Sequence, residues 1–563
     1  MKKKQPIHEK REYSSIREVI EDLGEIYKGR GAYCYRIKPS DKEIQKKSYE
    51  ELRDDVRALA SEFIAMGIPG KHIALVGKLS YHWILVYYAT LAVGAVLVPL
   101  DKEWLAQDLA DTGAKADVSY VFCDGDVVEK GRAIAEAANS HEPITLEYGE
   151  GTVDELINKG RVKFNEDSTP YYNTEIDVNK MSLLVFTSGT TGKGKGVMLS
   201  QENILCDIAD PLQYIDFTFK SIGVLPPHHT FGSTVSILGH NCIGCEIYIS
   251  SGLRYIQKEL KEQTPGHMVL VPLYLETFYR KIMANIKEKG KEKLIFRMIK
   301  ISNLLRKVGI DLRRKLFKDV LAAFGGEIRM VVSGGAPINQ DILSFYESVG
   351  IEILNGYGIT ECSPIIAVNH SHDLIPGSVG PALDVNEIKI NDPNEDGEGE
   401  IWAKGRNVML GYYKDEEATR EAITEDGYFK TGDYGKLGPK GEIYITGRKK
   451  NLIILSNGKN VYPEEIESEF ASVPGVIDIV VYEGQSKRGL MYNTIVAEVY
   501  PDQEYITKNN ITDIYAHLKK YVDEYNLRAV PYKKIGILKV RTEEFPKNTL
   551  RKITRFKLDM TID

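Results

Sequence analysis

Cysteine is scarce in this chain, with six in 563 residues. So few cysteines in so long a chain cannot form the disulfide framework of a small secreted protein. The first residues, MKKKQPIHEKREY, are basic, but no apolar stretch follows them to complete a secretory signal peptide. These two absences together predict a cytoplasmic protein in a reducing compartment.

The one CxxC pair is Cys242 and Cys245, in GHNCIGCEIYI. No second pair accompanies it, and its flanks are apolar and β-branched. We therefore favour a buried structural pair over a redox or zinc site.

Long apolar runs are also lacking. One run without charge, WILVYYATLAVGAVLVPL at 83–100, comes near the lower length limit for crossing a bilayer. Gly94 and Pro99 argue against a membrane helix. The pattern instead predicts a buried helix through about Ala92, a break at the glycine, and a short buried strand, as in one layer of an α/β sheet.

Positive charge is not in excess, because 73 Lys and Arg face 80 Asp and Glu, which leaves a net charge of -7. This balance argues against nucleic acid as a main partner. With 43% hydrophobic and 27% charged residues, the composition is that of an ordinary globular protein. A single core stops growing at roughly 250 to 300 residues, so two or more domains are expected.

The pattern of short β-branched runs predicts an α/β fold. Runs alternating with helical stretches indicate parallel α/β layers; they lie at 72–77, 118–123, 221–226, 267–272 and 328–335. After about residue 390, closely spaced short strands and Gly turns predict a β-rich, barrel-like part leading to a small α+β domain. We predict a large N-terminal domain over 1–448 and a small mobile C-terminal domain over 449–563.

A loop rich in Gly, Thr and Lys, TSGTTGKGKG at 187–196, follows the apolar run MSLLVF. Its glycines allow close approach of the backbone to an anion, and its hydroxyls and lysines are suitable donors, so phosphate is the expected ligand. The alternative is a solvated Gly-rich hairpin. The spacing from Gly189 to Lys195 fits G-x-x-x-x-G-K, but Gly196 follows where a Walker loop needs Ser or Thr.

Further motifs follow this loop in a fixed order. They are SGGAP (333–337), NGYGITECSP (355–364), GEGEIWAKGRNVMLGYY (397–413), YFKTGDYG (428–435), GRKKNLIILSNGKNVYPEEIE (447–467) and PKNTLRKITR (546–555). In this order and at these spacings, the chain from about 70 to 556 resembles the adenylate-forming, AMP-binding superfamily. That superfamily includes acyl-CoA synthetases, adenylation domains of peptide synthetases and luciferases.

The resemblance implies a nucleotide site. The phosphate loop would supply Thr187, Ser188, Gly189, Thr190, Thr191, Gly192 and Lys195. The base and α-phosphate would contact Gly334, Gly335, Ala336, Pro337, Asn355, Gly356, Tyr357, Gly358 and Thr360, with Tyr357 stacked on adenine. Asp433 would bind the ribose hydroxyls with Arg448 beside it, a task that suits an ionised acceptor.

The same resemblance implies the groups that act on the substrates. Glu361 and Thr190 would hold Mg²⁺, and Lys552 would be the catalytic lysine, with Thr187 and Lys195 at the phosphates. Lys450 would be the hinge. His229 matches the H-x-x-G residue beside the acyl pocket, although the adjacent His228 competes for that role and a structural histidine is the alternative.

Two positions depart from the family pattern. Gly194 stands where Pro is usual, and LRK at 550–552 replaces the usual S-G-K around the catalytic lysine. Lys547 and Arg551 are nearby cations that compete with Lys552 for the assignment.

A basic segment, KEKGKEKLIFRMIKISNLLRKVGIDLRRKLFK at 287–318, resembles an insert of long-chain acyl-CoA synthetases. Apolar residues recur in it at helical spacing, namely Leu294, Met298, Ile301, Leu305 and Val308, so one face is expected to be apolar and the other basic. Such a helix suits an anionic membrane surface. The alternative is a helix packed on its own domain with a solvated basic face.

The expected function is therefore that of a long-chain fatty acid:CoA ligase. Fatty acid and ATP, with Mg²⁺, would give acyl-adenylate and pyrophosphate, and the CoA thiol would then displace AMP. An alternative within the family is an acyl carrier protein as the thiol acceptor. An alternative from another class is a non-catalytic nucleotide-binding protein.

Overall fold

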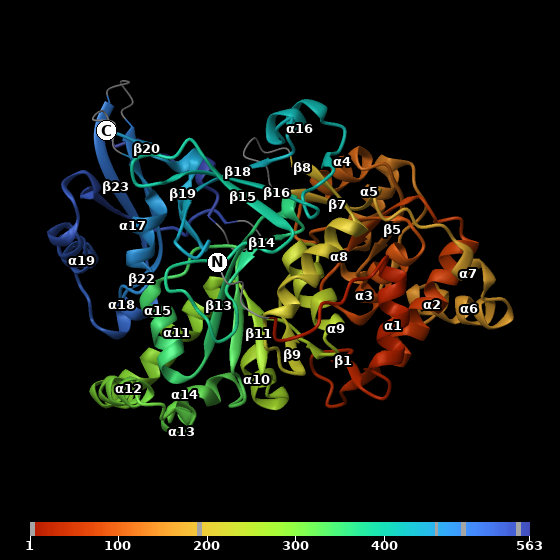
Figure 1. Cartoon of the computed structure of the whole chain (residues 1–563), viewed down its shortest axis with the longest axis horizontal. Helices are drawn as coiled ribbons and strands as arrows, with labels where there is room; N and C mark the ends of the chain where they lie inside the picture. Colours follow the sequence, from red (N-terminus) through yellow and green to blue (C-terminus); the bar gives the residue numbers. More distant parts are fainter. Residues whose placement is uncertain (1–5, 188–193, 456–459, 486–490, 548–552, 563) are drawn as a thin grey trace.

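A computed structural model describes residues 6–187, 194–455, 460–485, 491–547 and 553–562 (Figure 1). Its largest sheet has seven strands in the order β17-β8-β7-β4-β3-β5-β6. The strands are β3 (His72–Val76), β4 (Val96–Leu100), β5 (Val118–Cys123), β6 (Ile144–Thr145), β7 (Met181–Thr187), β8 (Lys195–Ser200) and β17 (Gly411–Tyr412). From β6 to β7 neighbouring strands are parallel, whereas β8 runs antiparallel to both β7 and β17.

Two further sheets contain the other predicted parallel strands. The first has the order β2-β1-β10-β9, with β2 (Gln45–Ser48), β1 (Gly31–Tyr35), β10 (Glu246–Ile249) and β9 (Lys220–Gly223). The second has the order β11-β12-β13-β14, with β11 (His267–Leu270), β12 (Met330–Ser333), β13 (Glu352–Gly358) and β14 (Ile365–Val368). All five runs predicted as strands form strands, and β11, β12 and β13 are parallel.

The uncharged run at 83–100 forms the helix, break and strand that the sequence predicts. Helix α3 (Tyr81–Ala92) begins at Ser80, whose hydroxyl accepts a hydrogen bond from the Trp83 amide, and every α3 side chain is buried. Gly94 then adopts φ +68, and a side chain there would lie 2.9 Å from the Glu175 carbonyl oxygen. Among the described residues no helix is both long and apolar enough to cross a membrane.

The CxxC cysteines are buried, as predicted. Cys242 ends the short helix α9 (His240–Cys242), and both thiols lie in the main apolar core. Burial raises the pKa of the Cys242 thiol to about 12, so its thiolate is strongly disfavoured.

Beyond residue 385 the chain forms an antiparallel sheet, as the change in the sequence predicts. Its order is β15-β16-β18-β19, with β15 (Asn386–Asn391), β16 (Gly399–Gly405), β18 (Phe429–Leu437) and β19 (Ile443–Arg448). Bridges between residues 367 and 382 and between 381 and 442 connect it to the sheet of β14.

The C-terminal elements form sheets of their own and occupy the blue part of Figure 1. They are β20 (Ile453–Ile454), β21 (Asn460–Val461), α17 (Pro463–Phe470), β22 (Val476–Gln485), β23 (Met491–Pro501), α19 (Ile514–Arg528) and β24 (Ile535–Val540). A separate apolar core joins α17 and α19 to these strands. The fold is thus a large layered α/β part with a smaller α+β part, whereas the boundary at 448/449 stays a prediction.

The basic segment forms the expected helix, α12 (Glu292–Arg306), but the domain covers only part of its apolar face. Of the five apolar residues at helical spacing, only Met298 packs on the domain core, together with Ile295 and Ile299. Leu294, Ile301 and Val308 are 52%, 52% and 72% exposed. The apolar stripe therefore lies at the edge of the helix–domain contact.

Candidate active site

Two loops at the carboxyl ends of β12 and β13 form the centre of the candidate site. In parallel α/β sheets ligands bind at these strand ends. SGGAP follows β12, with Gly334 buried and Gly335, Ala336 and Pro337 exposed. Asn355, Gly356, Tyr357 and Gly358 form the end of β13, and Thr360 starts the short helix η5 (Thr360–Cys362). The predicted base-binding residues are thus brought together.

Tyr357, Asp433 and Arg448 form one chain of contacts. The Tyr357 hydroxyl donates to Asp433 Oδ2 at 2.8 Å, and Arg448 Nε lies 2.9 Å from Asp433 Oδ1. Asp433 is buried, and its charge raises the pKa of the Arg448 guanidinium. Three residues assigned to adenine and ribose are therefore neighbours, although two of them are more than 70 positions from the third.

Glu361 and Lys195 meet at a residue that the sequence did not single out, Tyr412. The Tyr412 hydroxyl donates to Glu361 Oε1 at 3.0 Å, and Lys195 Nζ lies 4.7 Å from the Tyr412 ring centroid. Burial raises the pKa of the half-buried Glu361 carboxyl. Within the described ranges no lysine or arginine forms an ion pair with Glu361.

A buried carboxylate of this kind fits Mg²⁺ in one specific way. The described residues contain no group of three or more His, Cys, Asp or Glu that would hold a metal by themselves. Mg²⁺ usually keeps several waters and binds through one or two carboxylates plus substrate phosphates. Glu361 thus suits a metal that arrives with a nucleotide, and it does not indicate a permanent metal centre.

The ends of the predicted phosphate loop lie together. Thr187 ends β7 and Lys195 begins the antiparallel β8, with Thr187 Oγ1 3.5 Å from the Lys195 carbonyl oxygen. The predicted residues Ser188, Gly189, Thr190, Thr191 and Gly192 lie outside the described residues, so their assignment stays a prediction.

His229 lies just before the π-helix η3 (Phe231–Gly239). Its ring is 4.1 Å from that of His228, whose Nε2 is 3.5 Å from Asp101 Oδ2. Sterics require glycine at position 232, the last residue of the H-x-x-G pattern, because a Cβ there would lie 2.2 Å from the Pro226 carbonyl oxygen.

Lys450 lies in a short 3-10 helix, η6 (Lys449–Asn451), directly after Arg448. Burial, followed by the Arg448 charge, lowers the pKa of the Lys450 ammonium. Lys552 lies outside the described residues. Its competitor Lys547 is held by Asp478 at 2.6 Å and by Glu544 at 2.7 Å, a pairing that ties its ammonium to the C-terminal sheet.

An apolar cavity adjoins the base-binding residues and was not foreseen from the sequence. It is lined by Gly334, Gly335, Gly356, Tyr357 and Gly358 together with Ile208, Pro211, Leu212, Ile215, Phe217, Phe231, Val235, Gly239, Val332, Ser333, Pro364, Ile365 and Val368. None of these residues is charged. From η3, Phe231, Val235 and Gly239 recur every four residues on the face toward the cavity. The volume of this cavity is about 80 Å³, so it offers a short apolar group a place beside the predicted nucleotide site.

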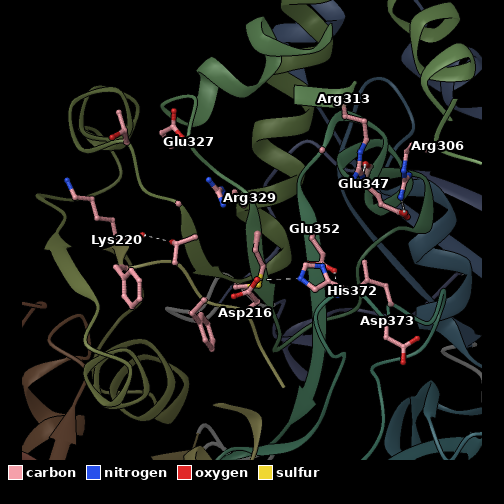
Figure 2. Close-up of a pocket in the computed structure, with 18 residues that line it drawn as sticks. Asp216, Lys220, Arg306, Arg313, Glu327, Arg329, Glu347, Glu352, His372 and Asp373 are labelled. Atoms are coloured by element: carbon pink, nitrogen blue, oxygen red, sulfur yellow. Dashed lines mark hydrogen bonds and ion pairs between the residues drawn. The ribbon is translucent and has the colours of Figure 1, made fainter. Parts of the chain in front are cut away.

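A larger cavity of about 1050 Å³ lies at the opposite end of the same strands, where Met330 and Glu352 begin β12 and β13. Figure 2 shows charges of both signs around it, with His372 between Asp216 and Glu352. Four Lys or Arg and five Asp or Glu line it, so the charges nearly cancel. It therefore lies at the opposite strand ends from the predicted nucleotide site. Phe217 lines both cavities.

The comparisons agree with this geometry. The family model described as AMP-binding enzyme matches residues 25–413, well over half of the chain. The chain belongs to the AMP-binding enzyme family.

Several relatives of this AMP-binding enzyme have names that mention fatty acids. It is 28% identical over 497 residues to long-chain-fatty-acid–CoA ligase 5 from Rattus norvegicus, covering 81% of this chain and 71% of the relative. It is 27% identical to a chloroplastic long-chain-fatty-acid–acyl-carrier-protein ligase from Arabidopsis thaliana, covering 92% and 82%. The two names differ in the acceptor.

Solved structures support the fold of this AMP-binding enzyme. ATP-bound MatB from Rhodopseudomonas palustris superimposes with a TM-score of 0.75 at 24% identity, covering 96% of this chain and 97% of that one. The anthranilate CoA ligase AuaEII with anthranoyl-AMP gives a TM-score of 0.76 at 16% identity, with 97% of each chain covered. The combination of sheets described above is therefore a known one.

We expect Asp433→Asn to weaken AMP binding roughly 10- to 100-fold, because hydrogen bonds to an ionised acceptor are stronger than those to a neutral amide. Isothermal titration of AMP into both proteins measures the loss. Glu398→Gln is the matched control, since Glu398 precedes β16 in the same sheet and pairs with Lys436 at 3.3 Å. Equal affinity for the Asp433 variant and the wild type would remove Asp433 from the site.

Proposed function

We propose that the protein activates a long-chain fatty acid with ATP and Mg²⁺ to give acyl-AMP, and then transfers the acyl group to the thiol of CoA. The products are acyl-CoA, AMP and pyrophosphate. The observation that carries activation of an acid is the uncharged cavity, which shares Gly334, Gly356 and Tyr357 with the predicted adenine site. At about 80 Å³ this cavity holds only part of a long chain, so the chain length in the proposal rests on the names of the relatives. A ligand with an apolar chain and a carboxylate head suits a cavity that ends beside a nucleotide.

The names of the relatives also favour a fatty acid over other acids, because long-chain-fatty-acid–CoA ligases from Rattus norvegicus and Mycobacterium tuberculosis match 81% and 77% of the chain at 28% identity. The apolar lining agrees with that substrate class, since a charged or polar acid would leave its side groups unpaired in such a cavity.

In the proposed first step, a carboxylate oxygen of the acid bonds to the α-phosphorus of ATP. The bond between the α-phosphorus and the oxygen that bridges it to the β-phosphorus breaks, and pyrophosphate leaves. Both reactants are anions, so cationic groups of the chain must offset the charge. Lys195, beside Tyr412 and Glu361, would serve the phosphates, and Lys552 would stabilise the transition state. Mg²⁺, when bound with ATP at Glu361, would supply further neutralisation of the phosphates.

In the proposed second step, the thiolate sulfur bonds to the acyl carbonyl carbon and AMP leaves with the electron pair of the carbon–oxygen bond. His229 would lie beside the acyl group during this transfer. The acceptor is CoA in our proposal, and acyl carrier protein is the alternative because one relative carries that name. A non-catalytic nucleotide-binding protein is the second alternative.

Exchange of labelled pyrophosphate into ATP tests the proposal. We expect exchange that depends on a saturated fatty acid and needs no thiol, because adenylation is complete before the acceptor binds. AMP release is then compared with CoA and with acyl carrier protein. If acids of every chain length fail to support exchange, the proposed function is contradicted. AMP release with carrier protein but without CoA would establish the alternative acceptor.

We also propose that 449–563 swings about Lys450, so that one cleft serves both steps. The described contacts between the two parts include few polar ones, such as Arg280 Nη1 to the Val476 carbonyl oxygen at 3.2 Å. Few contacts across a boundary favour relative motion.

Lys450→Pro should keep most adenylation but slow thioester formation, because proline restricts φ and removes the N–H at the pivot. Lys450→Ala is the control, since it removes the same charge and leaves the backbone free.

Lys552→Ala should do the opposite and slow adenylation roughly 100- to 1000-fold, while acyl-AMP and CoA still react. Adenylation and thioester formation are both measured on each variant. Equal losses in both half-reactions for Lys450→Pro, Lys450→Ala and Lys552→Ala would contradict the proposed hinge. A loss of adenylation in Lys547→Ala, and not in Lys552→Ala, would make Lys547 the catalytic lysine.

Phe217→Ala should shift the preferred acid to longer chains, because Phe217 lines both the apolar cavity and the polar one and loss of its ring would extend the apolar cavity. Each added methylene that becomes buried should favour the longer acid by roughly fourfold in kcat/KM. Phe231→Ala is the control, since Phe231 lines only the apolar cavity and its removal opens no passage. The readout is the exchange rate against chain length, and identical profiles for both variants would show that Phe217 is not the end wall.

A further inference from the structure

Helix α12 and the turn after it present an unusual number of large apolar side chains to solvent. Six of the 21 exposed large hydrophobic residues in the described part of the chain fall within 294–310. They are Leu294, Phe296, Ile301, Leu304, Val308 and Ile310, between 40% and 72% exposed. Exposed apolar residues scattered singly are normal, whereas a contiguous group marks an interaction surface.

Cations lie among these apolar side chains. Lys293, Arg297, Lys300 and Lys307 are exposed, and none of the four forms an ion pair with another described residue. With helical spacing, Lys293, Arg297, Lys300 and Leu304 share the side opposite Ile295, Ile299 and the buried Ser302. The outward surface of α12, defined by these four cations and the six apolar residues above, is therefore both apolar and basic.

The other basic residues of the segment have a different role, because they hold the helix to its domain. Arg306 pairs with Glu347 at 3.2 Å, and Arg313 Nη1 donates to the Glu347 carbonyl oxygen at 2.7 Å, as Figure 2 shows from the side of the polar cavity. Arg314 donates to the carbonyl oxygens of Ile328 and Gly326. These three arginines thus fix the segment to its domain.

We propose that the outward surface of α12 docks the protein on the surface of an anionic lipid bilayer. Cations along the outermost line of such a surface contact lipid phosphates, while Leu304 and the apolar side chains beside them enter the boundary between headgroups and acyl chains. Lysine stems extend over apolar surface and keep their ammonium groups at the headgroup level. Figure 1 shows α12 at the outer edge of the molecule, on the opposite side from α16 (Glu416–Ala422), where a flat membrane can reach it.

The charge pattern favours lipid over a second copy of the chain. A two-fold contact through this surface would place the same patch on both partners, so Lys and Arg would face Lys and Arg. An anionic bilayer complements the patch even though the whole protein carries a net charge of -7. The inference does not rest on the proposed enzymatic function.

The test is co-sedimentation of the full chain with vesicles of phosphatidylcholine alone or mixed with phosphatidylglycerol. The wild type should bind the anionic vesicles at low salt and lose binding at high salt, because screening weakens exposed charge contacts. Replacing Lys293, Arg297, Lys300 and Lys307 with Gln should weaken binding at least roughly 100-fold, since each basic residue near the surface contributes about a factor of five. Ile301→Ser with Leu304→Ser should also weaken binding and make the remainder more salt-sensitive.

Matched controls change the same chemistry elsewhere. Lys42, Lys71, Lys261 and Lys440 are exposed lysines distributed over the surface, and they are replaced together with Gln. Leu527→Ser and Leu437→Ser remove two exposed leucines away from α12. AMP binding reports whether each variant is folded. Failure of the wild type to bind anionic vesicles, or equal losses in the control variants, would overturn the proposal. The proposal would also be overturned if the wild type were a dimer that binds no vesicles and that Ile301→Ser with Leu304→Ser converts to monomer.

Discussion

Compensation of two carboxylates is the constraint on which the site depends. Asp433 and Glu361 are held in largely buried positions, where an isolated charge is costly. The Arg448 guanidinium and the Tyr357 hydroxyl both contact the Asp433 carboxyl group and fix its direction. Glu361 receives only the Tyr412 hydroxyl from a described side chain. The first carboxylate is therefore ready to accept hydrogen bonds, and the second is left for a cation that comes with a ligand.

The sheets determine how close these groups come. β13 supplies Tyr357 and leads directly to Glu361, while the antiparallel pair β18 and β19 places Asp433 opposite Arg448 in register. Gly358 permits the approach of the next turn, because a Cβ there would lie 1.8 Å from the Pro364 carbonyl oxygen. Residues from three sheets thus meet at the carboxyl ends of β12 and β13. The position of Arg448 at the last residue of β19 also couples the ribose carboxylate to the proposed hinge at Lys450.

Much of this could be predicted from the sequence because local patterns carry it. The buried helix α3, the turn at Gly94 and strand β4 follow from an uncharged run with a single glycine break, whereas the phosphate loop stays a prediction from residue types that suit an anion. Tyr412 was missed because a tyrosine beside a strand has no distinctive spacing, and only the fold brings it to Glu361 and Lys195. How much of the apolar face of α12 the domain covers could not be predicted, because periodicity defines a stripe but does not say toward which side the domain lies. Phe217 gave no signal, since its importance comes from two cavities formed by distant segments.

The position of Phe217 connects the apolar cavity to the rest of the molecule. The ring packs against the buried rings of His240 and His267, at centroid distances of 5.8 and 5.0 Å. Burial lowers the pKa of both imidazoles, to about 4 for His240, so both are neutral at physiological pH and suit an uncharged environment. Beyond this wall the surroundings become charged, with Asp216 and Lys220 in the same short segment. An apolar chain is therefore stabilised up to Phe217 and would meet charged groups and water beyond it. In the proposed function, the acid chain would extend from the reacting carboxylate toward this ring, and the size of the Phe217 side chain would influence which acids the site prefers.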